Sequence, residues 1–461
     1  MSEKKETQVT SAAFGKVPVI EKSAYAVASA GGNIINMVLG TFLSGYLTDS
    51  VGIAAAAVGT MMLVARVFDA ISDVCMGTII DRTKTKWGKA RPWLLVSAPL
   101  IALGTILVFA VPASLGDAAK LVYAYATYIF LNCICYTMFM VSHTAMLARI
   151  SLNGQERQSM TALNQIINQI GSLAVTTFMV AVVAVVGWTG AAAIYGIAAG
   201  ACILFGFFFT REHIGAAADP EGDLKKEETV PIKVALPAML KNKYFYMLTI
   251  LFVCILAHTA GSGSMTYYYC SVVLNNLDMV SFISACGVVP GMIINLFVPA
   301  LTKKFGRRNT LFVSSVCLCL SYLMVGLAGT NVALVCVAMI LRGTAGGPVF
   351  SCSFALASDV VDYGEWKTGI RSEGLLNSCV SFGQKVGLGI GPALATWIMA
   401  FGGYDGTAAV QTTAAVNSIL FAFGYLGAIF AGIMAVIAFF MNLDKYKPEI
   451  EAALAKKHVG V

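Results

Sequence analysis

The chain has 461 residues, of which 58% are hydrophobic and 12% charged, and its mean hydropathy is +0.77. Soluble domains carry about a quarter charged residues, so the composition excludes an ordinary soluble protein and indicates a chain that lies mostly in a lipid bilayer. The net charge of +7 is gathered in short loops and tails, which does not indicate a nucleic-acid partner.

Long apolar runs recur along the chain, and each can cross a hydrocarbon core of roughly 30 Å as a helix of about 20 residues. The runs are continuous rather than alternating, which favours helices over the strands of a barrel. We therefore predict an all-α membrane protein with twelve transmembrane helices, at residues 23–47, 52–80, 92–112, 120–148, 159–187, 191–210, 244–273, 279–301, 310–328, 332–361, 372–401 and 413–440.

The basic residues indicate on which side of the membrane each loop lies. With both termini in the cytoplasm, all but four of the 31 Lys and Arg fall in inner loops and tails, as the positive-inside rule requires. The longest hydrophilic stretch follows the sixth span, and its mixed charge and helix breakers are typical of a linker. The predicted organisation is an N-tail at 1–22, six-helix bundles at 23–210 and 244–440, a linker at 211–243 and a C-tail at 441–461.

The second predicted span carries Arg66, Asp69 and Asp73 within an apolar run. The spacing i, i+3, i+7 places the three on one helix face, and charges at this depth usually serve a function. Two carboxylates one turn apart repel each other, so this pair favours a bound H⁺ or Na⁺. Ser72, and Thr137 of the fourth span, offer hydroxyl oxygens to such a cation; beyond a possible Na⁺ at Asp69 and Asp73, we predict no metal.

Three basic residues lie within predicted spans, namely Arg66, Arg342 and Lys385. A static ion cluster, in which Arg66 and Lys385 neutralise the two acids, is the structural alternative to a cation site. For Arg342, in the outer half of the tenth span, two interpretations stay open. It either donates to an anion or hydroxyl of a substrate, or its side chain extends to the outer interface.

Acidic residues cluster where the tenth span ends and the eleventh begins. Opposite charges are available on other inner loops, so we predict a cytoplasmic gate of ion pairs that form and break as the protein opens. The alternative is a solvated rim in which each pair contributes little. The predicted gate residues are Asp359, Asp362, Glu365, Arg371, Arg149 and Arg157.

Two long stretches, "RVFDAISDVCMGTIIDRTKTKWGKARPW" and "DVVDYGEWKTGIRSEGLLNSCVSFGQKVG", and the shorter "YLTDSVGI" resemble signature regions of the glycoside–pentoside–hexuronide:cation symporters. This family, which includes melibiose permease and the glucuronide carriers, belongs to the major facilitator superfamily. The resemblance covers the whole chain. It implies the major facilitator fold, a cation site at Asp69 and Asp73 with Ser72 and Thr137 nearby, and coupling roles for Arg66 and Lys385. It also implies that Asp359, Asp362, Glu365 and Arg371 form an inner ionic lock.

The predicted sugar site departs from the melibiose-like pattern. Asn33 and Met140 stand where that pattern has acids, and Gln165 stands in place of an arginine. Amides such as Asn36 still suit a polar ligand, and the retained Arg342 adds weight to a uronide or other anionic glycoside. The substrate-cavity residues predicted in this way are Asn33, Asn36, Met140, Gln165 and Arg342.

The predicted function is cation-coupled symport of a sugar, glycoside or hexuronide by alternating access, driven by H⁺ or Na⁺. We predict no enzyme activity and no cofactor, because the sequence shows no nucleophile–base constellation or metal motif. The predicted partners are the sugar, a monovalent cation and the lipid bilayer, and the predicted location is the plasma (inner) membrane with both termini cytoplasmic. Two alternatives stay open: a carrier of a lysolipid or other amphiphile on the same fold, and a membrane sensor that transports nothing.

Overall fold

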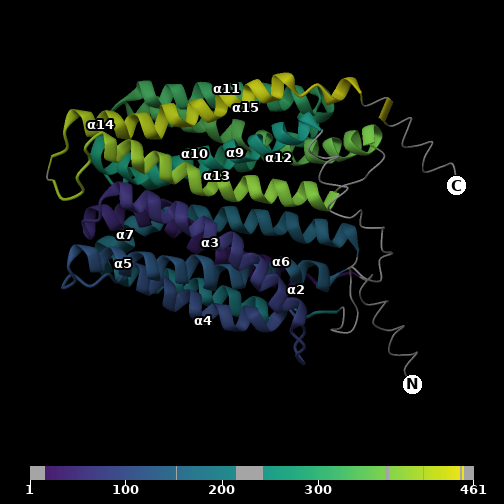
Figure 1. Cartoon of the computed structure of the whole chain (residues 1–461), viewed down its shortest axis with the longest axis horizontal. Coiled ribbons are helices and arrows are strands. Elements are labelled where there is room, and N and C mark those ends of the chain that lie inside the picture. Colours follow the sequence, from purple (N-terminus) through teal and green to yellow (C-terminus); the bar gives the residue numbers. More distant parts are fainter. Residues whose placement is uncertain are drawn as a thin grey trace. The chain divides into compact units, whose positions relative to one another are not determined.

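The computed structural model describes residues 16–151, 153–213, 242–368, 373–408, 410–446 and 449–450. The chain divides into two compact units. Unit 1 comprises Met1–Glu227 with Asp405–Ala408, and unit 2 comprises Glu228–Tyr404 with Ala409–Val461. Apart from one isolated bridge between Thr85 and Gly88, the described residues form helices and the loops that join them (Figure 1).

Unit 1 is a bundle of long helices, some of which pass directly into π-helical turns (purple to teal in Figure 1). The fourth predicted span, for example, runs without interruption from an α-helix through a π-helix into a second α-helix. The elements of unit 1 are α2 (Val19–Val38), η1 (Leu39–Leu43), η2 (Tyr46–Ser50), α3 (Ala55–Arg82), α4 (Arg91–Val108), α5 (Asp117–Ile129), η3 (Phe130–Tyr136), α6 (Thr137–Ile150) and α7 (Gly154–Phe209).

Unit 2 is a second helical bundle (teal to yellow in Figure 1). Its core is built from buried residues of the first, third, fourth, fifth and last long helices of the unit, among them Phe252, Tyr322, Leu356, Val380 and Met434. The elements of unit 2 are α9 (Lys243–Tyr268), η4 (Tyr269–Val273), α10 (Met279–Phe305), α11 (Arg307–Ala328), α12 (Val332–Thr368), α13 (Glu373–Phe401), α14 (Thr413–Leu420), η5 (Phe421–Tyr425), α15 (Leu426–Phe440) and the 3₁₀ turn η6 (Leu443–Lys445).

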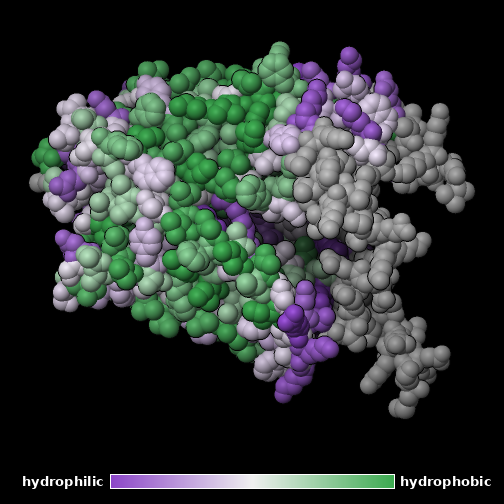
Figure 2. All heavy atoms as spheres, viewed as in Figure 1, coloured by the Kyte–Doolittle hydropathy of each residue, from purple (hydrophilic) through white to green (hydrophobic). Residues whose placement is uncertain are grey.

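Nine helices in the described part of the chain are long and apolar enough to cross a membrane. One of them, α7, is broken at Gly187, whose φ of 71° lies in the left-handed region that favours glycine. That break falls between the fifth and sixth predicted spans. On the face in view, hydrophobic residues cover the sides of the helices and hydrophilic residues gather near the helix ends (Figure 2). The fold is thus an all-α membrane fold, while the count of twelve spans and the domain boundaries stay predictions.

Small residues bring helices together within each unit. In unit 1 a Cβ added to Gly31 of α2 would lie 2.6 Å from the carbonyl oxygen of Ala199 in α7. In unit 2 a Cβ on Gly383 of α13 would lie 2.9 Å from the carbonyl oxygen of Thr249 in α9. Membrane helices lack a hydrophobic drive to associate, so such close backbone approach is a main source of their packing energy.

Candidate functional site

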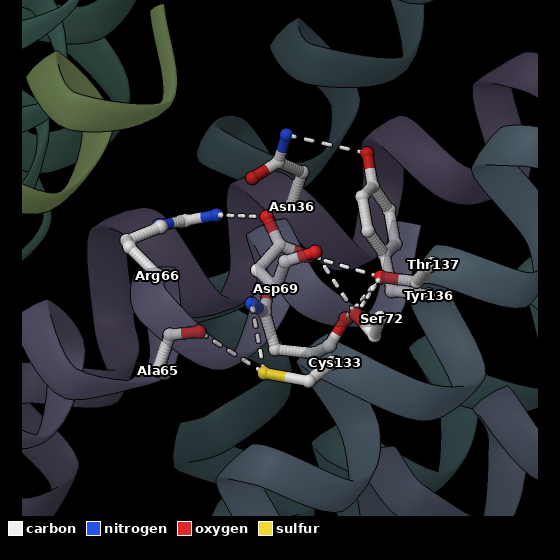
Figure 3. A network of polar contacts seen from close by, with 9 residues as sticks. Asn36, Ala65, Arg66, Asp69, Ser72, Cys133, Tyr136 and Thr137 are labelled. Carbon is white, nitrogen blue, oxygen red and sulfur yellow. Dashed lines mark hydrogen bonds and ion pairs between the residues drawn. The ribbon is translucent and has the colours of Figure 1, made fainter. Parts of the chain in front are cut away.

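The charged stretch of α3 meets α6 at a compact polar site, which we call the Asp69 site and define as Arg66, Asp69, Ser72 and Thr137 (Figure 3). The hydroxyl of Thr137 donates to Oδ1 of Asp69 at 2.9 Å, and Oγ of Ser72 lies 3.3 Å from the same hydroxyl. Nη1 of Arg66 lies 3.7 Å from Oδ2 of Asp69. The structure therefore brings four of the predicted ion-site and coupling residues together within unit 1.

A π-helix sets the position of Thr137. The turn η3 comes directly before α6, and the Thr137 hydroxyl is also 3.4 Å from the carbonyl oxygen of Asn132 in that turn. Within η3, the Cys133 thiol donates to the carbonyl oxygen of Ala65 at 3.2 Å, which ties the turn to α3 one helical turn before Asp69. π-Helical turns occur often at functional sites, and here the turn and its thiol contact align Thr137 with the carboxylate.

The Asp69 site combines burial with a dense set of oxygen atoms. Asp69 is 8% exposed and Thr137 is also buried, while Ser72 is half-buried. Asp69 is 13 residues from the C-terminal end of α3 at Arg82, which corresponds to about 20 Å of helix. A carboxylate with two hydroxyls at this depth is a donor set that suits a hard monovalent cation.

The two remaining predicted cation and coupling residues, Asp73 and Lys385, are not among the four residues that define the Asp69 site. Asp73 is half-buried on α3, one helical turn beyond Asp69. Lys385 is half-buried on α13, in unit 2. The roles of both residues stay predictions.

The predicted substrate-cavity residues of unit 1 are a mixed set. The amide nitrogen of Asn33 donates to the carbonyl oxygen of Asn168 at 2.8 Å and to the Ser172 hydroxyl at 2.7 Å, so this amide joins α2 to α7. Met140 is 47% exposed, and Asn36 and Gln165 are also exposed. The NH₂ group of Asn33 is thus already engaged in helix packing, which leaves its amide oxygen for a ligand.

Two of the predicted gate residues, Asp359 and Arg157, have partners within their own units. In unit 2, Nη1 of Arg307 lies 2.7 Å from Oδ1 of Asp359. In unit 1, the Arg157 guanidinium donates to the carbonyl oxygens of Ser151 at 2.5 Å and Ala148 at 3.1 Å. Asp362 is half-buried and Glu365 is buried near the end of α12, whereas Arg371 lies outside the described residues.

An unpredicted carboxylate, Glu212, links the start of α4 to the end of α6 in unit 1. It accepts the backbone N–H groups of Lys89, Ala90 and Arg91 at 3.0, 2.8 and 2.9 Å, and so caps the N-terminus of α4. Nη1 of the buried gate residue Arg149 lies 3.7 Å from Oε2 of Glu212. The prediction placed Glu212 in the linker, because its partners Lys89 and Arg149 are far from it in the sequence.

A second unpredicted pair lies beside this cap. The buried carboxylate of Glu21 accepts the backbone N–H of Arg211 at 2.7 Å, and Nε2 of His213 lies 2.9 Å from its other oxygen. Hydrogen bonding to Glu21 raises the pKa of His213, against the opposing effect of partial burial. This pair ties the start of α2 to the segment that follows α7.

Several known proteins are similar to this chain in sequence. A family profile described as MFS/sugar transport protein matches residues 24–445. The chain is 30% identical to the isoprimeverose transporter of Lactiplantibacillus pentosus, over 96% of this chain and 92% of that protein. It is also 30% identical to a glucuronide carrier protein homolog of Escherichia coli (strain K12), over 89% of each.

The fold has solved counterparts as well. The crystal structure of the nucleoside transporter NupG matches with a TM-score of 0.65 and 16% identity, over 92% of this chain and 99% of that chain. Such low identity carries information on the fold alone, and that fold is a transporter fold. From the profile match and the two relatives, the chain belongs to the MFS/sugar transport protein family and, within it, to the glycoside–pentoside–hexuronide:cation symporters.

Proposed function

We propose that this protein is a symporter that moves a sugar or glycoside together with a monovalent cation, and that the cation binds at the Asp69 site. The observation that carries the proposal is the buried Asp69 carboxylate, about 20 Å from the end of its helix, with the Thr137 hydroxyl 2.9 Å away. A carboxylate is expensive to bury in a membrane unless it is paired or functional. Beside the Arg66 contact at 3.7 Å, this site offers a cation the hydroxyl oxygens of Thr137 and Ser72.

Coupling follows from the charges of this site. A cation at Oδ1 of Asp69 competes with Arg66 for the carboxylate, so that its arrival alters the position and hydrogen bonding of the Arg66 guanidinium. If that change improves sugar binding, the sugar must improve cation binding by the same factor. The membrane potential then adds about 2.3 kcal/mol per charge per 100 mV to inward movement. Asp73 and Lys385 are proposed to take part in this exchange.

The sugar is proposed to contact polar side chains of the helices of unit 1. These are the amide oxygen of Asn33 and the side-chain amides of Asn36 and Gln165, with Met140 as an apolar contact. Amide groups bind the hydroxyls of a neutral or acidic sugar equally well, and the relatives are named for isoprimeverose and a glucuronide. The chain is an integral membrane protein; we propose the inner membrane and cytoplasmic termini, because the basic residues lie in the loops and tails assigned to that side.

We propose that the inner rim acts as the gate. The Arg307–Asp359 pair, at 2.7 Å, and the nearby Asp362 and Glu365 supply its charges in unit 2. Arg149, held by Glu212, and Arg157 supply positive charges in unit 1. Arg371 completes the predicted set.

The test is uptake of radiolabelled sugars by proteoliposomes that contain the purified protein, under an imposed sodium gradient and, separately, under a proton gradient. We expect accumulation of a sugar or glycoside under one of the two gradients and none when the gradient is collapsed. Sugar flux that ignores both gradients would refute coupling, and transport of a lysolipid but no sugar would refute the choice of substrate.

A further inference from the structure

Arg342 is a charged residue deep within unit 2. It lies ten residues after the start of α12 at Val332, about 15 Å along the helix and therefore near the middle of a bilayer. Neighbours on the same helix face, Met339, Ala345 and Val349, are buried in the unit. The side chain thus points into the bundle, and the outer-interface position that the sequence left open does not fit this placement.

Buried side chains from two other helices hold the Arg342 guanidinium. Its Nη1 donates to the hydroxyl of Ser262 on α9 at 2.5 Å, and its carbon lies 5.0 Å from the ring centroid of Tyr322 on α11. The Tyr322 hydroxyl in turn lies 2.9 Å from Nδ1 of His258. Cation–π contact over a desolvated ring and a charge-assisted hydrogen bond fix the cation in one place. We call Arg342, Ser262, Tyr322 and His258 the Arg342 cluster.

The Arg342 cluster contains no acid. None of the ion pairs among the described residues involves Arg342, and its hydrogen bonds all come from Nη1. Between residues 243 and 358 the sequence has a single acid, Asp278, in the loop before α10. The next acid along α12 is Asp359, 17 residues away, or about 26 Å of helix. Nε and Nη2, which form the fork that binds oxyanions in a bidentate manner, make no ion pair with a carboxylate in the part of the chain that the structure describes.

The charges of the membrane helices lead to the same conclusion. Away from the ends of the predicted spans, where Asp359 and Glu373 lie next to the loops, the membrane helices carry three basic residues, Arg66, Arg342 and Lys385, and two acids, Asp69 and Asp73, which is one positive charge more. A cation bound for symport raises that excess by one more. Uncompensated charge inside a membrane costs several kcal/mol, so a negatively charged substrate is favoured over a neutral one.

We propose that Arg342 binds the anionic group of the transported sugar, a carboxylate or a sulfonate, and that the protein therefore prefers acidic sugars to their neutral counterparts. This inference rests on the proposed symport function and narrows its substrate class. An arginine that served packing alone would need a partner for its charge, and Ser262 and Tyr322 are both neutral. An acidic sugar supplies two oxyanion acceptors that match the free edge of the guanidinium.

The experiment uses the full-length protein in proteoliposomes and a matched pair of ligands, a nitrophenyl glucoside and the corresponding glucuronide, with a sulfonated hexose as a third. The measured quantity is the ratio of the apparent Kd values of the neutral and acidic ligands, from competition with a labelled sugar. We expect the wild type to favour the acidic ligands, and Arg342→Gln to reduce that preference about 10- to 100-fold, because a hydrogen-bonded charge pair is lost.

Two control variants separate charge from packing. Arg342→Lys keeps the charge but not the bidentate fork, so we expect it to retain part of the preference. Arg308→Gln makes the same substitution at the start of α11, where the guanidinium donates to the backbone carbonyl oxygen of Ala438 at 3.2 Å, so its preference should change by less than about 3-fold. A sodium- or proton-dependent melting shift from the Asp69 site in unit 1 reports that each variant is folded; if the Gln variant fails this check, the Lys variant carries the comparison.

The outcomes distinguish the inference from the function on which it rests. An acidic-to-neutral preference that is unchanged in Arg342→Gln, or in Arg342→Lys where that variant carries the comparison, overturns the role of Arg342 while cation-coupled transport stands. Inorganic sulfate that competes as strongly as the glucuronide would place a free anion at Arg342 and overturn the substrate assignment. If no sugar is transported under either gradient, the proposed function itself fails.

Discussion

Replacing Asp69 by asparagine tests the cation site directly. The asparagine oxygen can still accept the Thr137 hydroxyl, which donates to Oδ1 at 2.9 Å in the wild type, so the helix contact survives while the charge is lost. A monovalent cation about 3 Å from a carboxylate oxygen is attracted by roughly 5 kcal/mol at an effective dielectric constant of 20. Even after desolvation of the ion is subtracted, we expect the cation affinity to fall by more than about 100-fold.

The assay is thermal unfolding of the purified protein in detergent, with sodium, lithium or potassium and at several pH values. A ligand present at 100 times its Kd stabilises the native state by about 2.7 kcal/mol, which corresponds to a rise in Tm of about 5–10 °C for a domain of this size. We expect that rise in the wild type and not in Asp69→Asn.

The matched control is Glu156→Gln, the same acid-to-amide change in unit 1. Glu156 pairs with Lys22 at 2.7 Å, at the inner end of the bundle rather than within it. This variant should keep the cation-dependent rise in Tm. An undiminished rise in Asp69→Asn would refute the assignment of the cation to this carboxylate.

Three further changes test other contacts of unit 1. Thr137→Val should weaken the apparent cation affinity about 10-fold, because a hydroxyl bonded to a charged group is lost. Thr137→Ser keeps that hydroxyl and should keep the wild-type affinity. Equal cation affinities of the two variants, measured by titration with thermal shift, would contradict this. Glu212→Gln should lower the free energy of unfolding by about 2–4 kcal/mol, since a buried pair with Arg149 is broken; an unchanged Tm would contradict it. His213→Asn should remove a pH-dependent contribution to the free energy of unfolding. Because Glu21 raises the pKa of His213, the wild type is more stable than the variant by the full amount below pH ~6.5. This difference in stability is lost as the pH rises through the folded-state pKa. Melting curves from about pH 5 to 9 check this, and two curves that run parallel would count against it.

Helix periodicity was sufficient to predict the face of α3 that carries the site. Arg66 and Asp69 are three residues apart, and in the structure their side chains meet on one face, with Ser72 three residues, or nearly one turn, further on. The apolar runs also predicted the long helices, because a bilayer accepts few other backbone structures. The break in α7 at Gly187 agrees with the boundary between two runs.

Contacts between distant helices were beyond helix periodicity, and Thr137 was predicted near Asp69 from the chemistry of its hydroxyl and from the family resemblance. Thr137 is 68 residues from Asp69, and its alignment depends on the π-helical turn η3, which leaves no periodic signature in the sequence. Glu212 follows an apolar span and resembles any polar linker residue until the fold brings Lys89 and Arg149 to it. The occupied NH₂ group of Asn33 likewise depends on how α2 packs against α7.

The π-helical turn has a consequence for how this site can change over evolutionary time. Such a turn accommodates one residue more than an α-helix of the same rise, and each residue of an α-helix turns the chain by about 100°. Deleting a single residue from Phe130–Tyr136 would therefore return this stretch to an α-helix and leave Thr137 near Asp69, whereas a deletion within α3 between Asp69 and Arg82 would rotate one part of that helix by about 100° relative to the other. The turn is thus the part of this helix in which the loss of one codon changes the ion site least.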